Sequence, residues 1–250
     1  MTGTRYPSLE GKTVVITGGG SGIGASIVEA FCDQGAKVAF LDIEEEASLT
    51  LVDRLDGAAR FHPCDLTDID ALRRTFSTIG EELGPPRVLV NNAASDERHA
   101  VDTVDVAFWD RAMAVNLRHL FFAAQAVRPA MAAAGGGSII NLSSVAWIYG
   151  QVGMIAYSTA KAGIVGMTNS LAREFGSDDI RVNAIAPGAV MTDKQLRLWY
   201  DEESARAVAE RQIIRHRLEP MEIARAALFL ASDDSRMITK QCLVVDAGLR

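Results

Sequence analysis

The chain alternates short apolar runs with longer segments in which apolar residues recur with a helical period. The apolar runs are rich in β-branched residues and predict strands that are covered on both faces, whereas the longer segments predict amphipathic helices. We expect seven strands, at Thr13–Thr17, Lys37–Leu41, Arg60–His62, Val88–Asn91, Ser138–Leu142, Arg181–Ile185 and Gln241–Val245. Strands and helices that alternate in this way build βαβ units, so the pattern predicts an α/β fold with a doubly wound parallel sheet and helices on both faces.

Glycines mark the ends of two predicted helices. Gly35 follows the helix Ile23–Gln34 and Gly176 follows the helix Tyr157–Phe175, and we expect both glycines to act as C-caps.

No linker interrupts the pattern, so residues 1–250 are expected to form one domain. Ala126–Ala134 and the three glycines after it predict the end of a helix and a turn into the next strand, not a domain boundary. The stretch Pro187–Leu218 has weaker sheet character and mixed charge, and a substrate lid is expected around residues 188–218.

The composition narrows the class of partner. The 32 acidic residues against 25 Lys and Arg give a net charge of -7, which disfavours nucleic acid and anionic membranes and favours a small-molecule substrate. Cys32, Cys64 and Cys242 are widely spaced and are interpreted as reduced thiols. Neither a signal segment nor a long apolar run is evident, so the expected location is the cytoplasm.

A glycine-rich loop follows the first predicted strand. Gly18-Gly19-Gly20-Ser21-Gly22-Ile23-Gly24 leads from Thr13–Thr17 directly into a helix. Strand before and helix after predict a Rossmann-type turn, in which a pyrophosphate sits at the helix N-terminus and the absence of Cβ atoms gives it clearance. A P-loop is excluded because the Lys-Ser/Thr pair is absent.

Asp42 ends the second predicted strand, 18 residues after Gly24. A carboxylate at this place accepts hydrogen bonds from both adenosine ribose hydroxyls and repels a 2′-phosphate. The sequence therefore predicts NAD rather than NADP as cofactor. Glu44, Glu45 and Glu46 are interpreted as helix-start charges that add to the negative field.

Three residues carry the candidate chemistry. Tyr157 and Lys161 are four residues apart at the start of a predicted helix, so both side chains project from one face. The ammonium is expected to lower the pKa of Tyr157 from its ordinary value of about 10, which would make Tyr157 a general base or acid. Ser144 lies 13 residues before Tyr157, at the carboxyl end of a predicted strand, where open parallel sheets bind ligands.

Together these motifs resemble those of the short-chain dehydrogenase/reductases over nearly the whole chain. The matching residues, in order and spacing, are Thr17-Gly18, Gly22-Ile23-Gly24, Asn91-Asn92-Ala93, Asn116, Ser144, Tyr157 with Lys161, and Pro187-Gly188. One departure is Ala94, where this family usually has glycine. The resemblance also implies a homotetramer with helices Leu117–Ala134 and Tyr157–Phe175 in the interface.

The resemblance implies a role for each residue. Ser144 would orient the reacting oxygen, Tyr157 would exchange the proton, and Lys161 would hold the nicotinamide ribose and tune Tyr157. Asn116 would anchor a water that links the lysine to solvent. Ser143 is the alternative to Ser144, but the 13-residue spacing favours Ser144. Beside Tyr157 and Lys161, the implied cofactor-binding residues are Gly18, Ser21, Gly22, Ile23, Gly24, Asp42, Ile43, Asp65, Leu66, Asn92, Ala93, Ala94, Pro187, Gly188, Val190 and Thr192.

A finer resemblance points to bacterial aldose 1-dehydrogenases of the xylose type, which oxidise the anomeric hydroxyl of a cyclic aldose to a lactone. A polyol needs polar groups around the reacting carbon. Besides Ser144 and Tyr157, the candidates for substrate contact are Arg98, His99, Gln151 and Gln195, with Trp147 or Trp199 stacking on a sugar face. Trp147 is alternatively a core residue.

Other functions stay open. A 3-oxoacyl reductase or another secondary alcohol dehydrogenase would keep the same catalytic residues, but Asp42 and the acidic charge count against an NADPH enzyme that docks an acidic carrier. A non-catalytic dinucleotide sensor would have no need of Tyr157. No metal site is expected, because the cluster of His62, Cys64 and Asp65 has no zinc-ligand spacing.

Overall fold

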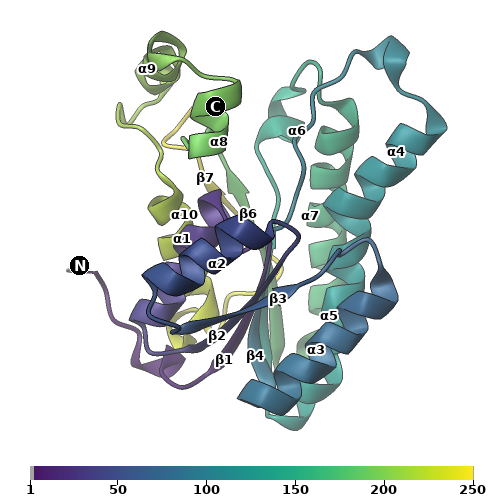
Figure 1. The fold of residues 1–250 in the computed structure, drawn as a ribbon, viewed down its shortest axis with the longest axis vertical. Coiled ribbons are helices and arrows are strands. Elements are labelled where there is room, and N and C mark those ends of the chain that lie inside the picture. The colour runs from purple at the N-terminus through teal and green to yellow at the C-terminus, as the bar shows by residue number, and fades with distance from the viewer. Residues whose placement is uncertain (1–2, 250) are drawn as a thin grey trace.

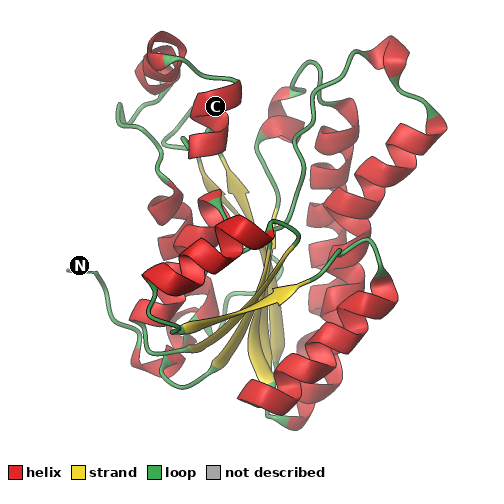
Figure 2. Ribbon diagram, viewed as in Figure 1, coloured by secondary structure: helices red, strands yellow, loops and turns green. Residues whose placement is uncertain are grey.

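All seven predicted strands are present and pair in parallel in one sheet (Figures 1 and 2). The structure is a computed structural model in which residues 3–249 are described. The strands are β1 Thr13–Thr17, β2 Lys37–Asp42, β3 Ala59–Pro63, β4 Pro86–Asn91, β5 Gly137–Leu142, β6 Ile180–Pro187 and β7 Cys242–Val245, in the spatial order β3-β2-β1-β4-β5-β6-β7. The predicted doubly wound sheet is therefore confirmed, with its switch point between β1 and β4.

Helices cover both faces of this sheet, as Figure 1 shows. Helices α1, α2 and α10 lie on one face, and α3, α4, α5 and α7 lie on the other. The bounds of the helices are α1 Gly22–Asp33, α2 Glu45–Arg54, α3 Ile69–Leu83, α4 Val106–Met113, α5 His119–Ala133, α6 Ala146–Tyr149, α7 Ile155–Phe175, α8 Asp193–Leu198, α9 Glu202–Arg211 and α10 Pro220–Ala231. Ala114–Arg118 forms a π-helical turn between α4 and α5.

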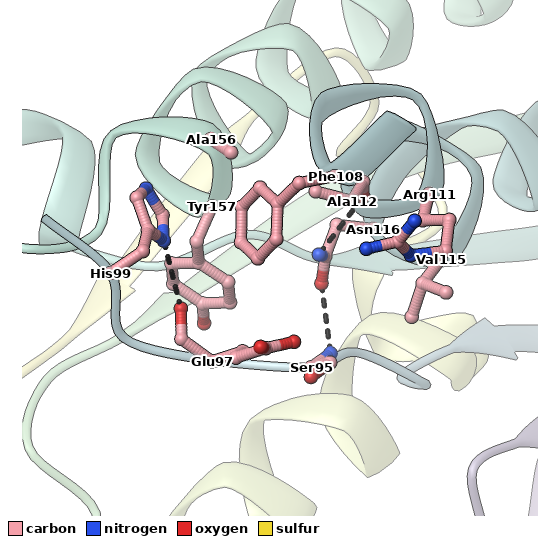
Figure 3. Close-up of a pocket in the computed structure, with 10 residues that line it drawn as sticks. All are labelled: Ser95, Glu97, His99, Phe108, Arg111, Ala112, Val115, Asn116, Ala156 and Tyr157. Atoms are coloured by element: carbon pink, nitrogen blue, oxygen red, sulfur yellow. Dashed lines mark hydrogen bonds between the residues drawn. The ribbon is translucent and has the colours of Figure 1, made fainter. Parts of the chain in front are cut away.

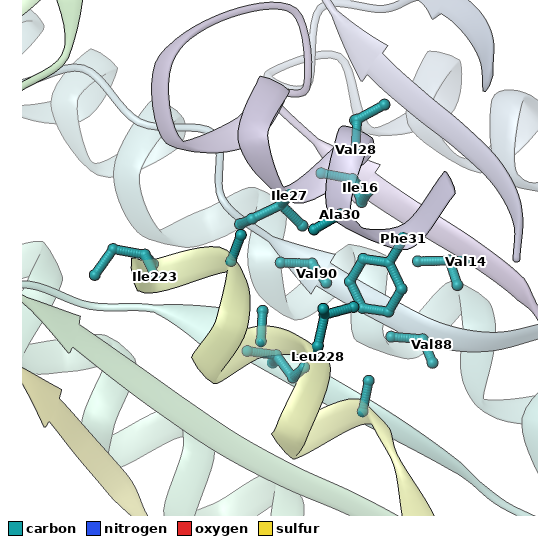
Figure 4. Close-up of a cluster of buried hydrophobic side chains, with 14 of the residues drawn as sticks. Val14, Ile16, Ile27, Val28, Ala30, Phe31, Val88, Val90, Ile223 and Leu228 are labelled. Carbon is teal, nitrogen blue, oxygen red and sulfur yellow. The ribbon is translucent and has the colours of Figure 1, made fainter. Parts of the chain in front are cut away.

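A separate apolar core fills each side of the sheet, because the central strands are buried on both faces. Figure 4 shows Phe31 of α1 among β-strand valines such as Val14 and Val88, with Leu228 of α10 close by. The second core lies under α3, α5 and α7 and includes Leu89 and Ile139. All residues of β1 are buried, so the continuous apolar run of this strand reflects its two-sided burial.

The helix ends agree with one glycine prediction and not with the other. Gly35 follows α1 with φ of +75°, in the left-handed region that favours glycine. Gly176 is not a left-handed C-cap: its φ is -61°, and the chain continues in a 3₁₀ turn through Asp178. The reversal falls instead on Asp179, with φ of +55°, since aspartate tolerates this region better than most residues.

The segment predicted as a lid holds α8 and α9, which stand over the carboxyl ends of β6 and β7 in Figure 1. The two ends of the segment pair with each other, and the segment is also tied to the C-terminal part of the chain. Val190 pairs with Leu218 in an isolated bridge, and the Ile214 amide donates to the Ala247 carbonyl at 3.0 Å. These contacts hold the segment at the carboxyl edge of the sheet.

Candidate active site

Ser144 and Tyr157 meet at the carboxyl edge of the sheet. Ser144 follows β5, and its Oγ accepts the Ala146 amide at 3.1 Å. Tyr157 lies in the first turn of α7, where a side-chain hydrogen bond joins it to Ser144. Two hydroxyl groups from different elements therefore share the place where a reacting oxygen would lie.

Lys161 is buried one turn further along α7, with 2% of its surface exposed. Its Nζ donates to the Leu142 carbonyl at 2.7 Å and lies 5.4 Å from the centre of the Tyr157 ring. Burial lowers the pKa of Lys161 to about 7, although the charge of Asp96 opposes that shift. The lysine is thus held close to Tyr157 by a backbone carbonyl.

The expected lowering of the Tyr157 pKa is wrong for the protein alone. Burial raises the pKa of Tyr157 to about 12, the hydrogen bond from Ser144 opposes this shift, and the charge of Asp96 adds to it. The sequence showed the cation at helical spacing but not the desolvation that both side chains undergo on packing.

Ser143 and Ser144 have different surroundings. The Ser143 hydroxyl is buried and donates to the Lys161 carbonyl at 2.7 Å, so it ties β5 to α7. Only Ser144 is joined to Tyr157, which favours Ser144 as the residue that orients a substrate.

Asn116 is buried within the π-helical turn, and both the oxygen and the nitrogen of its side-chain amide make hydrogen bonds to the backbone. Its Oδ1 accepts the Ser95 amide at 2.9 Å, and its Nδ2 donates to the Ala112 carbonyl at 3.0 Å. Asn116 thereby fixes the loop after β4 against α4.

A cavity of ≈ 170 Å³ adjoins Tyr157 (Figure 3). Asn116, His99 and Phe108 are among its lining residues, so α4, α7 and the loop after β4 all contribute. In Figure 3 the Tyr157 hydroxyl points toward the loop that carries Ser95 and Glu97.

The glycine-rich loop is built as a cradle at the N-terminus of α1. A Cβ on Gly24 would lie 1.8 Å from the Gly18 carbonyl oxygen, and one on Gly18 would lie 2.6 Å from the Ala93 Cα. These glycines are required for the close packing of the loop. The Ser21 side chain makes no capping hydrogen bond within the described residues, so the first N–H groups of α1 remain directed outward and fit an anionic pyrophosphate.

Asp42 closes the side of this cradle at the end of β2. Its carboxylate accepts the amide of Gly20 at 2.8 Å, that of Ile43 at 2.7 Å and that of Glu44 at 3.0 Å. The carboxylate is therefore fixed beside the loop, in a position that suits a ribose diol.

Some of the remaining predicted cofactor residues support the glycine-rich loop, and others lie at the carboxyl edge of the sheet. Asn92 is scaffold, since its Nδ2 donates to the carbonyl oxygens of Gly18 and Thr17. Thr192 caps α8 and lies beside the glycine-rich loop, where a Cβ added to Gly22 would come within 3.3 Å of its Cγ2. The other residues lie at the same edge, at or after the ends of β3, β4 and β6. Asp65 is exposed and its carboxylate accepts the Thr67 amide at 2.8 Å, while Leu66 and Val190 are buried. Gly188 packs against Asp246, Ala94 is exposed, and Ala93 and Pro187 complete the set.

Three of the residues predicted to contact a sugar make contacts between the loop after β4 and the α8 region. Gln195 of α8 donates Nε2 to Asp96 Oδ2 at 2.6 Å. Trp199 has one face covered by the Arg98 guanidinium, 4.1 Å from the ring centre, which leaves only the opposite face for a sugar.

The other three lie at the cavity or in and just after α6. The His99 ring packs edge-on against Phe108 at 4.7 Å and lines the cavity. Gln151 is exposed after α6. Trp147 is 37% exposed, so the alternative that it is a core residue is wrong.

Sequence reasoning did not single out Asp96 and His119 as site residues. Asp96 contacts two residues of α8 and acts electrostatically on Tyr157 and Lys161. His119 is fully buried, and burial together with the Lys161 charge lowers its pKa to about 4, so its imidazole is neutral. Their positions follow from loop and helix packing, which residue spacing does not reveal.

Within residues 3–249, no group of three or more His, Cys, Asp or Glu residues is placed to hold a metal. Cys32, Cys64 and Cys242 are free thiols. None of the described helices is both long and apolar enough to cross a bilayer.

Comparison with known proteins gives the family of the chain. Residues 18–250 match a family model described as enoyl-(acyl carrier protein) reductase. A "Probable galactose dehydrogenase" of Rhizobium meliloti is 47% identical, with 100% of this chain and 99% of the relative covered. The D-xylose 1-dehydrogenase of Caulobacter vibrioides is 46% identical, with 100% of both chains covered. A 3-oxoacyl-[acyl-carrier-protein] reductase of Thermotoga maritima is 38% identical, with 96% of this chain and 98% of the relative covered.

Solved structures with a similar fold include members of the short-chain dehydrogenase/reductases. A short-chain type dehydrogenase/reductase from Mycobacterium ulcerans has a TM-score of 0.91 at 26% identity, with 98% of this chain and 91% of that chain covered. A blue fluorescent protein from a metagenomic library, solved in complex with NADPH, has a TM-score of 0.88 at 33% identity, with 97% of this chain and 99% of that chain covered. The chain therefore belongs to the short-chain dehydrogenase/reductase family of oxidoreductases, which bind a nicotinamide dinucleotide.

Proposed function

We propose that the protein oxidises the anomeric hydroxyl of an aldose to the lactone, with NAD as cofactor and Tyr157 as general base. The observation that carries this proposal is the meeting of Ser144, Tyr157 and Lys161 beside a cradle closed by Asp42, in a chain similar over its full length to two dehydrogenases named for aldoses. The reaction removes a proton from the hydroxyl oxygen and a hydride from the anomeric carbon.

The chain's own residues account for the proton. Ser144 hydrogen-bonds the anomeric oxygen and orients it, while Tyr157 takes the proton as general base. Lys161, held by the Leu142 carbonyl, stabilises the tyrosinate. The side-chain oxygen and nitrogen of Asn116 are both hydrogen bonded. Its main-chain carbonyl would therefore bind the water of a proton relay.

The cofactor would be held by the cradle and the edge described above. The outward N–H groups of α1 would bind the pyrophosphate, Asp42 the adenosine ribose, and the segment from Pro187 to Thr192 the nicotinamide side. When bound, the nicotinamide ring supplies the hydride acceptor. The choice of NAD over NADP rests on the fixed carboxylate of Asp42 and the acidic residues after it.

A second candidate is reduction of 3-oxoacyl groups. The similarity to the Thermotoga maritima reductase and the description of the family model favour it. The Asp42 carboxylate and the net charge of -7 count against it, because they disfavour NADPH and an acidic carrier protein.

We also propose a homotetramer located in the cytoplasm, with α8 and α9 acting as a substrate lid over the carboxyl edge. The two helices predicted for the interface correspond to α5 and α7. Their outer surface suits helix packing: Ala162, Gly166 and Ser170 form an exposed small-residue row on α7, and Phe121 of α5 is 41% exposed.

The direct test of the substrate class is NADH formation from NAD with a panel of pentoses, hexoses and deoxysugars beside simple secondary alcohols and 3-hydroxyacyl thioesters. We expect turnover on aldoses, with a lactone as product. Activity confined to alcohols or thioesters would be compatible with the proposed catalytic residues but would refute an aldose as the substrate.

For Tyr157→Phe we expect kcat to fall by about 10²- to 10⁴-fold, because the proton carrier is removed while the ring stays. Binding of NAD, followed by calorimetry, should be retained. Tyr6→Phe, which changes a tyrosine packed against the core beside α1, is the matched control and should leave kcat unchanged. Turnover close to wild type in Tyr157→Phe would refute the assignment of the general base.

For Asp42→Ala we expect the ratio of kcat/KM for NAD over NADP to fall about tenfold or more, the equivalent of one charge-assisted hydrogen bond. Asp42→Asn keeps an acceptor for the loop amides and should shift the ratio in the same direction. Asp53→Ala, on the exposed face of α2, is the control. An unchanged ratio in both Asp42 variants would count against the ribose role.

Size-exclusion chromatography with light scattering tests the assembly. Four chains of 26.9 kDa are expected at micromolar concentration. Gly166→Arg should yield smaller species, because a long cation replaces the small residue at the helix contact, whereas Asp53→Arg on the opposite face of the sheet should not. A monomeric wild-type protein at this concentration would refute the proposed homotetramer.

A further inference from the structure

Asp96 joins the loop after β4 to α8. Its Oδ1 lies 2.9 Å from Lys194 Nζ, and its Oδ2 accepts Gln195 Nε2 at 2.6 Å. Only 19% of the Asp96 side chain is exposed, against 51% for Lys194. The carboxylate is therefore the inner member of the group and the lysine the outer one.

The carboxylate is ionised and close to the catalytic residues. Burial opposes ionisation of Asp96, but the hydrogen bonds and the charge of Lys194, together with Gln195, outweigh it and hold the Asp96 pKa below its ordinary value. Its charge also acts on both Tyr157 and Lys161. Figure 3 shows the Tyr157 hydroxyl directed at the loop that carries Ser95 and Glu97, and Asp96 lies between these two residues in the sequence.

The three side chains have hydrogen-bonding capacity beyond the two bonds they make with one another. A carboxylate has about four acceptor sites, an ammonium three donors, and a primary amide two donors and an acceptor oxygen. Each sugar hydroxyl both donates and accepts, so neighbouring hydroxyls on one face of a ring match a row that contains both kinds of group. A linear acyl chain with one oxo group has no neighbouring hydroxyls that could form hydrogen bonds with these three side chains.

We propose that Asp96, with Lys194 and Gln195 of α8, is the subsite that recognises the hydroxyls next to the reacting carbon of a polyhydroxylated substrate. The inference rests on the proposed aldose oxidation and deepens it by naming residues that select for a polyol. In this arrangement Asp96 accepts hydrogen bonds from the ring hydroxyls, and Lys194 and Gln195 donate from the α8 side. The Arg98–Trp199 stack, 4.1 Å from cation to ring centre, supports the same contact between loop and α8 region.

The test compares kcat/KM for an aldose with kcat/KM for its 2-, 3- and 4-deoxy analogues, in wild type and in Asp96→Asn. In wild type, loss of the recognised hydroxyl should cost about 10- to 100-fold, as expected for a hydrogen bond to a charged group. In Asp96→Asn this penalty should shrink toward onefold, mainly through a higher KM for the full aldose. Both substrates are measured on the same protein, so the fraction of folded enzyme cancels from the ratio.

Two further variants separate recognition from structure. Asp102→Asn removes an exposed carboxylate from the same connection and should keep every wild-type ratio. Lys194→Met leaves the Asp96 carboxylate in place but removes a donor, and should reduce the same deoxy penalty in part.

The possible failures are distinguishable. If wild type oxidises aldoses but shows no deoxy penalty, or if Asp96→Asn keeps all penalties, the subsite is overturned and the proposed function stands. If wild type oxidises no aldose, the proposed function and the subsite both fall.

Discussion

The strand order of the sheet reverses between β1 and β4, which pair in parallel, and hydrogen bonds from Asn92 and Ala93 continue this pairing past the end of β1 into the glycine-rich loop. The Asn92 amide group donates to the Gly18 and Thr17 carbonyls, and the backbone amides of Asn92 and Ala93 reach the buried Thr17 hydroxyl at 3.1 and 3.3 Å. These bonds fix the glycine-rich loop on one side and the start of the loop after β4 on the other. The cofactor cradle and the substrate loop thus share one anchor, and a shift of β4 against β1 would move both.

A second set of buried polar contacts aligns the catalytic helix. Asn91 donates to Asn141 at 2.9 Å and Asn141 to Thr168 at 3.0 Å, which connects β4 and β5 to α7 through the core. The Ser143 hydroxyl and the Lys161 ammonium add two bonds between β5 and the first turns of α7. Because buried polar groups are costly when unpaired, this network restricts how α7 can slide along the sheet. Tyr157 is thereby held beside Ser144.

The parts of the molecule that could be predicted from sequence are those set by local periodicity. Every strand was located to within about two residues, since two-sided burial produces continuous apolar runs. The glycine-rich loop and the Tyr157–Lys161 spacing also have local signatures. Gly176 failed as a C-cap because the choice between Gly176 and Asp179 depends on where the following turn packs. The raised pKa of Tyr157 and the contact of Asp96 with α8 depend on burial and on segments about 100 residues apart, which no local pattern encodes.

The central claim is that a hydride leaves the anomeric carbon of an aldose at the site of Ser144, Tyr157 and Lys161. Transfer of label from an aldose deuterated at C1 to NAD tests this most directly, with the nicotinamide C4 position read by mass spectrometry or NMR. The account predicts one deuterium in each reduced cofactor and a lactone as product. Reduced cofactor without label, formed while the sugar is consumed, would show that the hydride comes from another carbon and would contradict the account.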